Sequence, residues 1–275
     1  KRGMDFLAGP WNAWIVERYG SLDEAEQDWD YRLERLGTPG SHPHAAGGQS
    51  VAAPPAGRCF LEHGPWDRAA AAFRRFFSDY VGQRYGEFIR RLRRFDPNHL
   101  ITFRFGACGI PSGNRFAHAH SAGVARHVDF LCPEGYDLQP NSPGKPAPDD
   151  EIRKGGLITL FYRFLGREKP VVWMEFGYTV QGIHTPWQIG MVHVAPAELE
   201  NQRQEFQRFF DMFLESGAQG AAPWWLPGGF RLGENSDFGV LEPDGSQRPA
   251  CDVLKQALPR FAEVPQSSVA APKGP

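Results

Sequence analysis

The sequence predicts an α/β fold in which strand–helix units build a parallel sheet, and three observations support this. Short apolar runs rich in β-forming residues alternate with helix-like segments along most of the chain. The runs are largely apolar, as expected of parallel strands covered on both faces. The chain has 275 residues, 41% of them hydrophobic, which is enough for a packed core and close to the roughly 250 residues of an eight-stranded α/β barrel.

The first third of the chain predicts helices around one long loop. Residues 11–36 are predicted as helix, with a capping sequence at Ser21–Glu24 that begins a second helical stretch. Residues 37–58 are rich in Gly, Pro, Ala and Ser and are predicted as a loop. A long helix is predicted over residues 67–95, and Asp96-Pro97-Asn98 ends it.

The remainder of the chain shows the alternation that defines the fold class. Four strands are predicted, at residues 99–106, 128–132, 170–176 and 220–226. Each is followed by a predicted helix, at residues 121–127, 150–166, 196–216 and 251–261. Because strands and helices alternate, the strands are expected to be parallel neighbours in βαβ units.

Four strands are half the number that closes a (β/α)8 barrel, and an isolated half has two open sheet edges. The chain begins at Lys1 without an initiator Met or a signal-like apolar segment. We therefore expect residues 1–262, with a loop insertion at 37–65, to be the C-terminal half (strands five to eight) of such a barrel. Its N-terminal half would lie in the same gene or in a second chain, and residues 263–275 would form a disordered tail or linker.

Composition excludes several classes of protein. Thirty basic against 32 acidic residues give a net charge of −2 without a basic block, which argues against a nucleic-acid partner. No apolar run approaches the length of a membrane span. The four cysteines lack Cys-x-x-Cys spacing, which leaves free thiols or one disulfide open. Aromatic residues make up 13% of the chain, and their flat faces are surfaces on which sugar rings stack.

Functional side chains of parallel α/β barrels lie where the strands end. Glu175 is the strongest single candidate, because a carboxylate that ends an apolar strand is costly unless it faces the barrel mouth with partners. The alternative is a purely structural ion pair with a nearby Arg. Carboxylates, a cation, a phenol and an indole pair are what a sugar-cleaving site requires. The predicted strand ends supply Arg104, Glu134, Tyr136, Glu175, Trp224 and Trp225.

His118 and His120 indicate a second kind of site, a metal site, because two histidines with His-x-His spacing can ligate a metal from a strand. They lie in a loop beside Asn114 and Arg115 without an acidic partner nearby, which favours a solvated or substrate-contacting loop. A metal-dependent barrel hydrolase is therefore kept as an alternative.

Five segments, in the expected order, resemble clan A glycoside hydrolases. Residues 169–177 (KPVVWMEFG) are similar to the clan's seventh-strand signature, whose Glu is the nucleophile. Residues 11–23 (WNAWIVERYGSLD) resemble the helix that follows strand four in family 42 and some family 5 members. Residues 95–102 and 128–136 are similar to the clan's strands five and six, and residues 236–249 to the run after strand eight.

The resemblance implies a retaining β-glycoside hydrolase that acts on a β-linked oligo- or polysaccharide. Glu175 would be the nucleophile that forms a covalent glycosyl-enzyme intermediate. The resemblance gives binding roles to the others: Tyr136 orients Glu175, Arg104 keeps it ionised, Glu134 contacts substrate, and Trp224 or Trp225 stacks on a sugar. The alternative for Trp225 is that its side chain is directed outward into the helical layer. No cofactor is implied, and the enzyme class favours a secreted or periplasmic bacterial protein.

The chain departs from the clan in one respect. The clan's acid/base is the Glu of an Asn-Glu pair ending strand four, and no such pair precedes Trp11. We expect the acid/base to lie upstream of Lys1. A non-catalytic carbohydrate-binding relative is the alternative.

Overall fold

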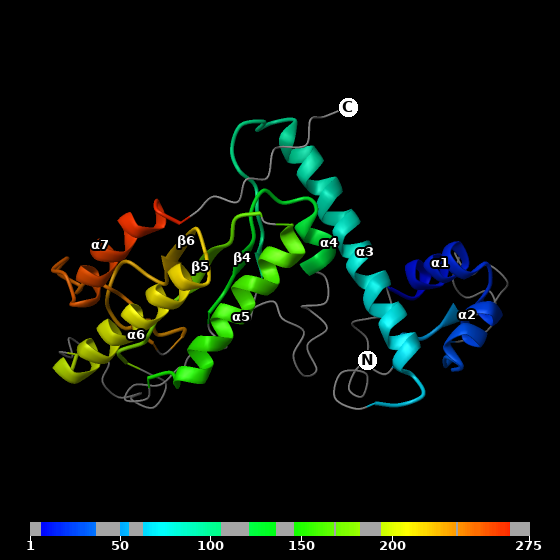
Figure 1. Cartoon of the computed structure of the whole chain (residues 1–275), viewed down its shortest axis with the longest axis horizontal. Helices are drawn as coiled ribbons and strands as arrows, with labels where there is room; N and C mark the ends of the chain where they lie inside the picture. Colours follow the sequence, from blue (N-terminus) through cyan, green and yellow to red (C-terminus); the bar gives the residue numbers. More distant parts are fainter. Residues whose placement is uncertain are drawn as a thin grey trace. The chain divides into compact units, whose positions relative to one another are not determined.

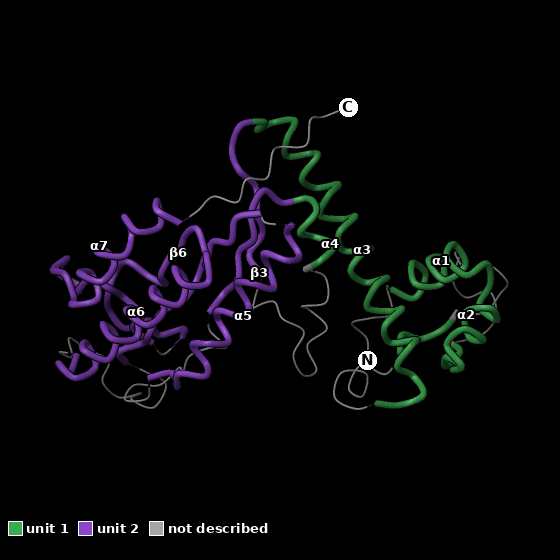
Figure 2. Tube along the Cα trace, in the orientation of Figure 1, with its two compact units in different colours: residues 1–97, 111–127 green, residues 98–110, 128–275 purple. Residues whose placement is uncertain are grey.

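A computed structural model describes residues 7–36, 50–54, 63–105, 121–135, 146–167, 169–181, 194–234 and 236–264. The chain divides into two compact units (Figure 2). The first unit comprises residues 1–97 and 111–127, and the second comprises residues 98–110 and 128–275. Within the described ranges, no helix has the length and apolar character needed to cross a membrane.

The first unit is mainly helical (Figure 1). Its elements are α1 (Ala8–Tyr19), α2 (Leu22–Trp29), β1 (Arg35–Leu36), β2 (Ser50–Val51), α3 (Asp67–Arg93) and α4 (Ser121–Ala125). The predicted cap is present, because the Ser21 hydroxyl accepts the backbone N–H of Glu24 at 3.1 Å and begins α2. The predicted long helix agrees with α3 to within two residues.

The helix predicted over residues 11–36 is wrong at its C-terminal end, because α2 stops at Trp29. Asp30 has a left-handed backbone (φ 52°), which ends the helix. The Glu26 carboxylate then accepts the backbone N–H of Leu33 at 2.8 Å and pairs with Arg35. This pairing holds the chain extended where a helix was predicted.

The loop predicted over residues 37–58 is also wrong at Ser50–Val51, which forms β2 and pairs antiparallel with β1. Val51 donates its backbone N–H to the side-chain oxygen of Asn12 at 3.2 Å, and Val51 is buried. The two-residue strand is therefore fixed by contacts with α1 rather than by its own sequence pattern.

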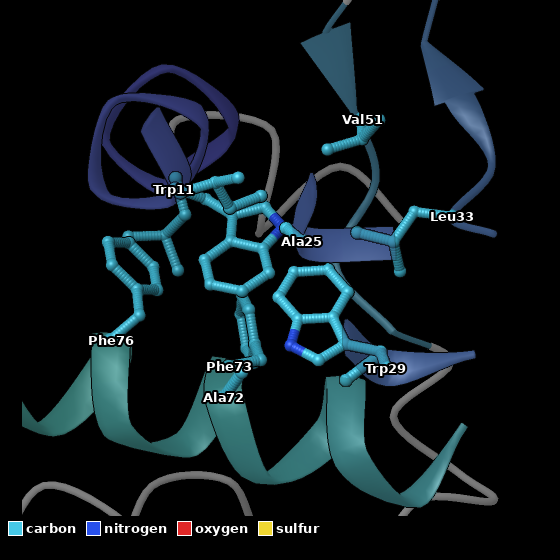
Figure 3. Packing of buried hydrophobic residues seen from close by; sticks show 11 residues of the cluster. Trp11, Ala25, Trp29, Leu33, Val51, Ala72, Phe73 and Phe76 are labelled. Carbon is cyan, nitrogen blue, oxygen red and sulfur yellow. The ribbon is translucent and has the colours of Figure 1, made fainter. Parts of the chain in front are cut away.

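An aromatic cluster forms the core of the first unit (Figure 3). The Trp11 and Trp29 rings stack at 5.8 Å between centroids, joining α1 to α2. Phe73 and Phe76 of α3 each lie 5.2 Å from the Trp11 ring. Aromatic pairs at these distances stabilise by about 0.5–1.5 kcal/mol beyond the area they bury. These rings are what fixes the three helices to one another.

Helices α3 and α4 approach so closely that their contact allows only glycine. A Cβ on Gly123 would lie 1.9 Å from the carbonyl oxygen of Ser78, and a Cβ on Gly82 would lie 2.7 Å from the Gly123 backbone. We predict that Gly123→Ala lowers the free energy of unfolding by about 1–3 kcal/mol or more, since overpacking forces backbone movement. Urea unfolding followed by circular dichroism measures this loss.

Gly156 in α5 (Asp149–Gly166) is the matched control, because the nearest atom to a Cβ there is 3.9 Å away. Gly156→Ala should stabilise the chain by about 0.5–1 kcal/mol through helix propensity alone. A Gly123→Ala protein as stable as the wild type would contradict close packing of α3 on α4.

The second unit contains the parallel strands. Its elements are β3 (Arg104–Phe105), β4 (Cys132–Pro133), α5, β5 (Val172–Phe176), α6 (Pro196–Glu215), β6 (Gly220–Pro223) and α7 (Ala250–Phe261). The pairs β3–β4 and β5–β6 are parallel. Parallel bridges from Leu131 to Val171 and from Glu134 to Glu175 join β4 to β5. The four strands are therefore neighbours in chain order, which confirms the predicted alternation.

The strands are shorter than predicted. Residues 99–103 lie outside β3, where Ile101 donates its backbone N–H to the Asp129 carboxylate at 2.6 Å. The predicted strand over residues 128–132 is shifted, since β4 begins at Cys132. At β6, regular pairing ends at Pro223 rather than at Leu226.

Helices α5 and α6 cover one face of β5. Trp173 donates its indole N–H to the Thr159 hydroxyl of α5 at 3.1 Å, and its ring packs 5.1 Å from Phe213 of α6. Phe176 also contacts Phe213, at 4.9 Å, and three more phenylalanines of α6 surround it. The side chains of Trp173 and Phe176 thus anchor β5 to the helical layer.

Candidate active site

A β-bulge in β5 directs Glu175 away from the helical layer. Trp173 pairs with Ala221 and Phe176 with Pro223, so three steps along β5 oppose two along β6. Without the bulge, Glu175 would share the face of Trp173, because alternate residues of a strand face the same way. The extra residue lets Trp173 and Phe176 both meet α6 and leaves Glu175 on the other side, as bulges near active sites do.

Glu175 meets Arg104 and Glu134 at the C-terminal ends of the strands. The Arg104 guanidinium pairs with Glu134 through Nε and with Glu175 through Nη1. The two carboxylate side chains are 10% and 11% exposed, whereas Arg104 is 58% exposed. One cation from β3 therefore bridges two nearly buried carboxylates from the next two strands.

The backbone fixes the spacing of the two glutamates. Glu134 and Glu175 form a parallel bridge, and Gly135 donates its N–H to the Glu175 carbonyl at 2.7 Å. Neighbouring strands lie about 4.8 Å apart. With one positive and two negative side chains, the cluster of Arg104, Glu134 and Glu175 has a formal net charge of −1. It presents a carboxylate pair at the C-terminal ends of two adjacent strands.

Cys132 of β4 lies just before Glu134 in the sequence but is unsuited to nucleophilic chemistry. Burial raises the pKa of its thiol to about 11, although a hydrogen bond with Thr102 works in the opposite direction. A thiol with such a pKa is protonated at neutral pH and is a poor nucleophile. Cys132 is therefore not a candidate nucleophile among the described residues of these strand ends.

Trp224 and Trp225 follow β6 at the same edge. Trp224 donates its backbone N–H to the Phe176 carbonyl at 2.6 Å, one residue beyond Glu175. The two indole rings stack on each other at 5.1 Å, and the peptide bond between them is cis. The Arg231 guanidinium lies 5.0 Å from the Trp224 ring and 4.3 Å from the Trp225 ring. The two tryptophans are therefore joined by backbone pairing to the strand that carries Glu175, and their rings stack on each other and on Arg231.

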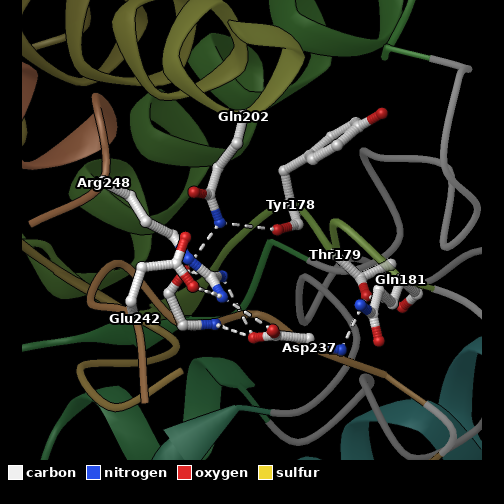
Figure 4. Close-up of polar contacts among 8 residues, drawn as sticks. Tyr178, Thr179, Gln181, Gln202, Asp237, Glu242 and Arg248 are labelled. Carbon is white, nitrogen blue, oxygen red and sulfur yellow. Dashed lines mark hydrogen bonds and ion pairs between the residues drawn. The ribbon is translucent and has the colours of Figure 1, made fainter. Parts of the chain in front are cut away.

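A buried ion pair fastens the chain segments that leave β5 and β6 (Figure 4). Arg248 pairs with Asp237 through both guanidinium Nη atoms, at 2.8 and 3.1 Å, and the side chains are 1% and 3% exposed. Glu242 accepts a third bond from Arg248 at 3.0 Å. Burial works to lower the pKa of Arg248, but the bonds to Asp237 and Glu242 outweigh it and raise the pKa above its ordinary value.

Further bonds connect this ion pair to the segment after Glu175. The Asp237 carbonyl accepts the backbone N–H of Val180 at 2.8 Å, and Asp237 donates its own N–H to the Thr179 hydroxyl at 3.0 Å. Gln202 of α6 donates its side-chain amide to the carbonyls of Tyr178 and Gly239. Residues 178–181, which follow the strand of Glu175, are therefore hydrogen-bonded to residues 236–248.

The structure brings together three of the six residues that the strand-end rule selected, namely Arg104, Glu134 and Glu175. Trp224 and Trp225 directly follow β6, the strand next to that of Glu175. Tyr136, His118 and His120 lie outside the described residues. Among the residues that are described, no group of three His, Cys, Asp or Glu side chains is arranged to hold a metal ion.

Sequence reasoning assigned no role to Asp237, Arg248 or Gln202. Asp237 and Arg248 belong to the 236–249 segment that resembles the run after strand eight, so a signal was present. Gln202 is an amide on an amphipathic helix, and nothing in its neighbourhood in sequence distinguishes it from a solvent-exposed residue.

Comparisons with known proteins give similarity of structure only. No protein-family model matches the chain, and no curated protein matches it. Among solved structures, the chain is similar to a β-galactosidase from the Antarctic haloarchaeon Halorubrum lacusprofundi, with 18% identity and a TM-score of 0.61 over 98% of this chain and 37% of that one. It is also similar to an agarase, AgWH50C, with 15% identity and a TM-score of 0.58 over 92% of this chain and 31% of that one.

A third similar structure is a β-galactosidase from the psychrophilic Marinomonas ef1, with 16% identity and a TM-score of 0.52 over 94% of this chain and 36% of that one. The chain thus spans about a third of the length of these proteins. At such identities the likeness shows a shared fold. The predicted α/β fold is confirmed at this level, and the assignment of this chain to the C-terminal half of a (β/α)8 barrel stays a prediction.

Proposed function

We propose that this chain is the C-terminal half of a (β/α)8 barrel from a retaining β-glycoside hydrolase, with Glu175 as the nucleophile. The observation that carries the proposal is the Arg104-bridged pair of Glu134 and Glu175 at the C-terminal ends of adjacent parallel strands. Active sites of α/β barrels are built at this edge. The fold shared with an agarase and two β-galactosidases supports a β-linked carbohydrate as substrate.

In the proposed reaction, a carboxylate oxygen of Glu175 attacks the anomeric carbon while the glycosidic C–O bond breaks. The leaving oxygen takes a proton from a second carboxylic acid. Water then cleaves the glycosyl–Glu175 ester, giving its proton to the same group. Arg104 holds Oε2 of Glu175 and so fixes the carboxylate's orientation, which serves a nucleophile that must approach one carbon along one line.

Glu134 is better suited to bind substrate than to supply the proton. Arg104 pairs directly with Glu134, and in the clan that the sequence resembles, strand six does not supply the acid. The acid/base is therefore proposed to come from the N-terminal half of the barrel, encoded upstream of Lys1. No cofactor is needed for chemistry carried out by two carboxyl groups.

Covalent trapping tests the nucleophile directly. We predict that a 2-deoxy-2-fluoro glycoside labels the full-length product of the gene at Glu175, because the fluorine slows hydrolysis of the glycosyl-enzyme ester. Peptide mass spectrometry should find the adduct on the peptide that contains Glu175 and on no other.

Glu175→Gln, which keeps the size of the side chain but replaces one carboxylate oxygen with an amide NH2, should abolish labelling. Labelling of Glu134 instead would refute the assignment. A protein that binds sugars but neither turns them over nor accepts the label would be the non-catalytic carbohydrate-binding relative, and the proposed activity would be rejected.

A further inference from the structure

The first unit contains a groove that has no part in the site described above. It lies along α1 and α3 and has a volume of about 560 Å³. This is within the range of small-molecule sites, about 300–1,000 Å³. Six of its lining residues carry hydrogen-bonding groups, namely Trp14, Glu17, Arg18, Asp79, Tyr80 and Gln83.

The helical repeat explains how the two helices line one groove. Trp14, Glu17 and Arg18 lie three and four residues apart on α1 and share one face. Asp79 and Gln83 are four residues apart on α3 and form the facing wall. Both sets of side chains are held in place because the helices carrying them pack on the aromatic core.

The floor of the groove is aromatic. Trp14 lies 6.1 Å from Phe76, and Phe76 lies 5.7 Å from Tyr80, so three rings cross from α1 to α3. Above them stand carboxylate acceptors, a guanidinium donor and a carboxamide that both donates and accepts. Phe76 is buried, at 1% exposure, so the rings available to a ligand are those of Trp14 and Tyr80, which are half-buried. We propose that this groove binds a short, neutral oligosaccharide, whose apolar ring faces would contact Trp14 and Tyr80 and whose hydroxyls would bond to the walls.

The lining disfavours other occupants. It contains no Leu, Ile, Val or Met, the aliphatic residues that line grooves for amphipathic helices. The charge of Arg18 offsets one of the two carboxylates, and Arg126 lies 3.8 Å from Asp79. The groove therefore has no strong field for an ion of either sign. A polar, uncharged ligand with flat apolar faces matches it best.

Sugar binding would move Arg18 and Arg84. The Arg18 guanidinium lies over the Trp14 ring, 5.5 Å from the ring centroid, and the Arg84 guanidinium lies over the Tyr80 ring, 5.3 Å from its centroid; both residues are exposed. An exposed Arg side chain changes rotamer at little cost, so the guanidinium can leave the indole face and donate to a hydroxyl. Binding should consequently change the fluorescence of Trp14.

Binding to this groove does not depend on chemistry at Glu175, so it is tested by titration of the full chain. The probes are β-1,4-linked hexaoses of glucose, mannose and xylose and an agarose-derived hexaose, followed by calorimetry and tryptophan fluorescence. We expect at least one to bind with a Kd of roughly 1 mM or tighter. Glu17→Ala combined with Gln83→Ala should weaken it about tenfold, since both residues are exposed and their loss removes hydrogen bonds without disturbing the core.

Glu34→Ala combined with Arg90→Ala is the matched control, because both residues are exposed on the same unit and neither lines the groove. Binding that survives Trp224→Ala but is lost in the groove variant supports the proposal. Binding lost only with Trp224→Ala would overturn it and would leave the proposed active site intact. Absence of binding by all four sugars would also overturn it, and covalent labelling of Glu175 would not be affected by that result.

Discussion

Replacement of Glu175 by Gln is expected to reduce turnover of a β-linked substrate by about 10³-fold or more, with substrate binding nearly unchanged. The amide keeps the shape of the side chain and can remain near Arg104, but it cannot form the glycosyl ester. The loss should therefore appear in kcat and leave KM little altered. Steady-state kinetics on the full-length gene product, compared with sugar binding by calorimetry, measures both effects.

Glu134→Gln is the control that separates the nucleophile from its neighbour. Both carboxylates pair with Arg104 and both are nearly buried, so a general loss of charge would affect turnover equally in the two variants. We expect Glu134→Gln to act mainly on KM, because its proposed role is substrate contact. Equal loss of kcat in the two variants would contradict a unique role for Glu175.

Azide should restore turnover to a variant that lacks the nucleophilic carboxylate. A small anion can replace a missing carboxylate nucleophile if it fits the space left by a smaller side chain. Glu175→Ala should regain turnover with azide and release a glycosyl azide of inverted configuration, since only one displacement then occurs. Recovery in Glu134→Ala rather than in Glu175→Ala would reassign the nucleophile.

The sequence predicted the strand–helix alternation well because each unit carries a local signal. Apolar β-forming runs marked the strands, and capping residues such as Ser21 marked helix starts. The antiparallel pair formed by Arg35–Leu36 and Ser50–Val51 escaped prediction for a physical reason. Its contacts are made by Glu26 and Asn12, which are distant in sequence from one or both strands.

The candidate site followed from one rule, that chemistry in a parallel sheet lies at the carboxyl ends of its strands. That rule selected Arg104, Glu134 and Glu175, and the structure joins them. The bulge that frees Glu175 from the helical layer was not predicted. It depends on how Trp173 and Phe176 pair with β6 and pack on α6, and a pattern confined to one strand does not encode either contact.

Removal of the charge on Arg248 should destabilise the second unit by about 3–5 kcal/mol. Arg248→Met keeps most of the side-chain volume but leaves Asp237 buried without its cation. The lost bonds also release the Gly239 carbonyl and Glu242, which hold the segment after β6. Urea unfolding monitored by circular dichroism should show the transition of the second unit at lower denaturant.

Arg260→Met provides the comparison, because its ion pair with Asp211, at 3.2 Å, is exposed on both sides and should be worth no more than about 1 kcal/mol. The double variant Arg248→Met with Asp237→Leu distinguishes the origin of the loss. If the cost comes from an unpaired buried charge, removing both charges should recover part of the stability lost in Arg248→Met. If the cost comes from the backbone carbonyls and amides that the pair holds, the double variant should be no more stable than the single one. Either result bears on Glu175, since the same bonds fix residues 178–181 immediately after its strand.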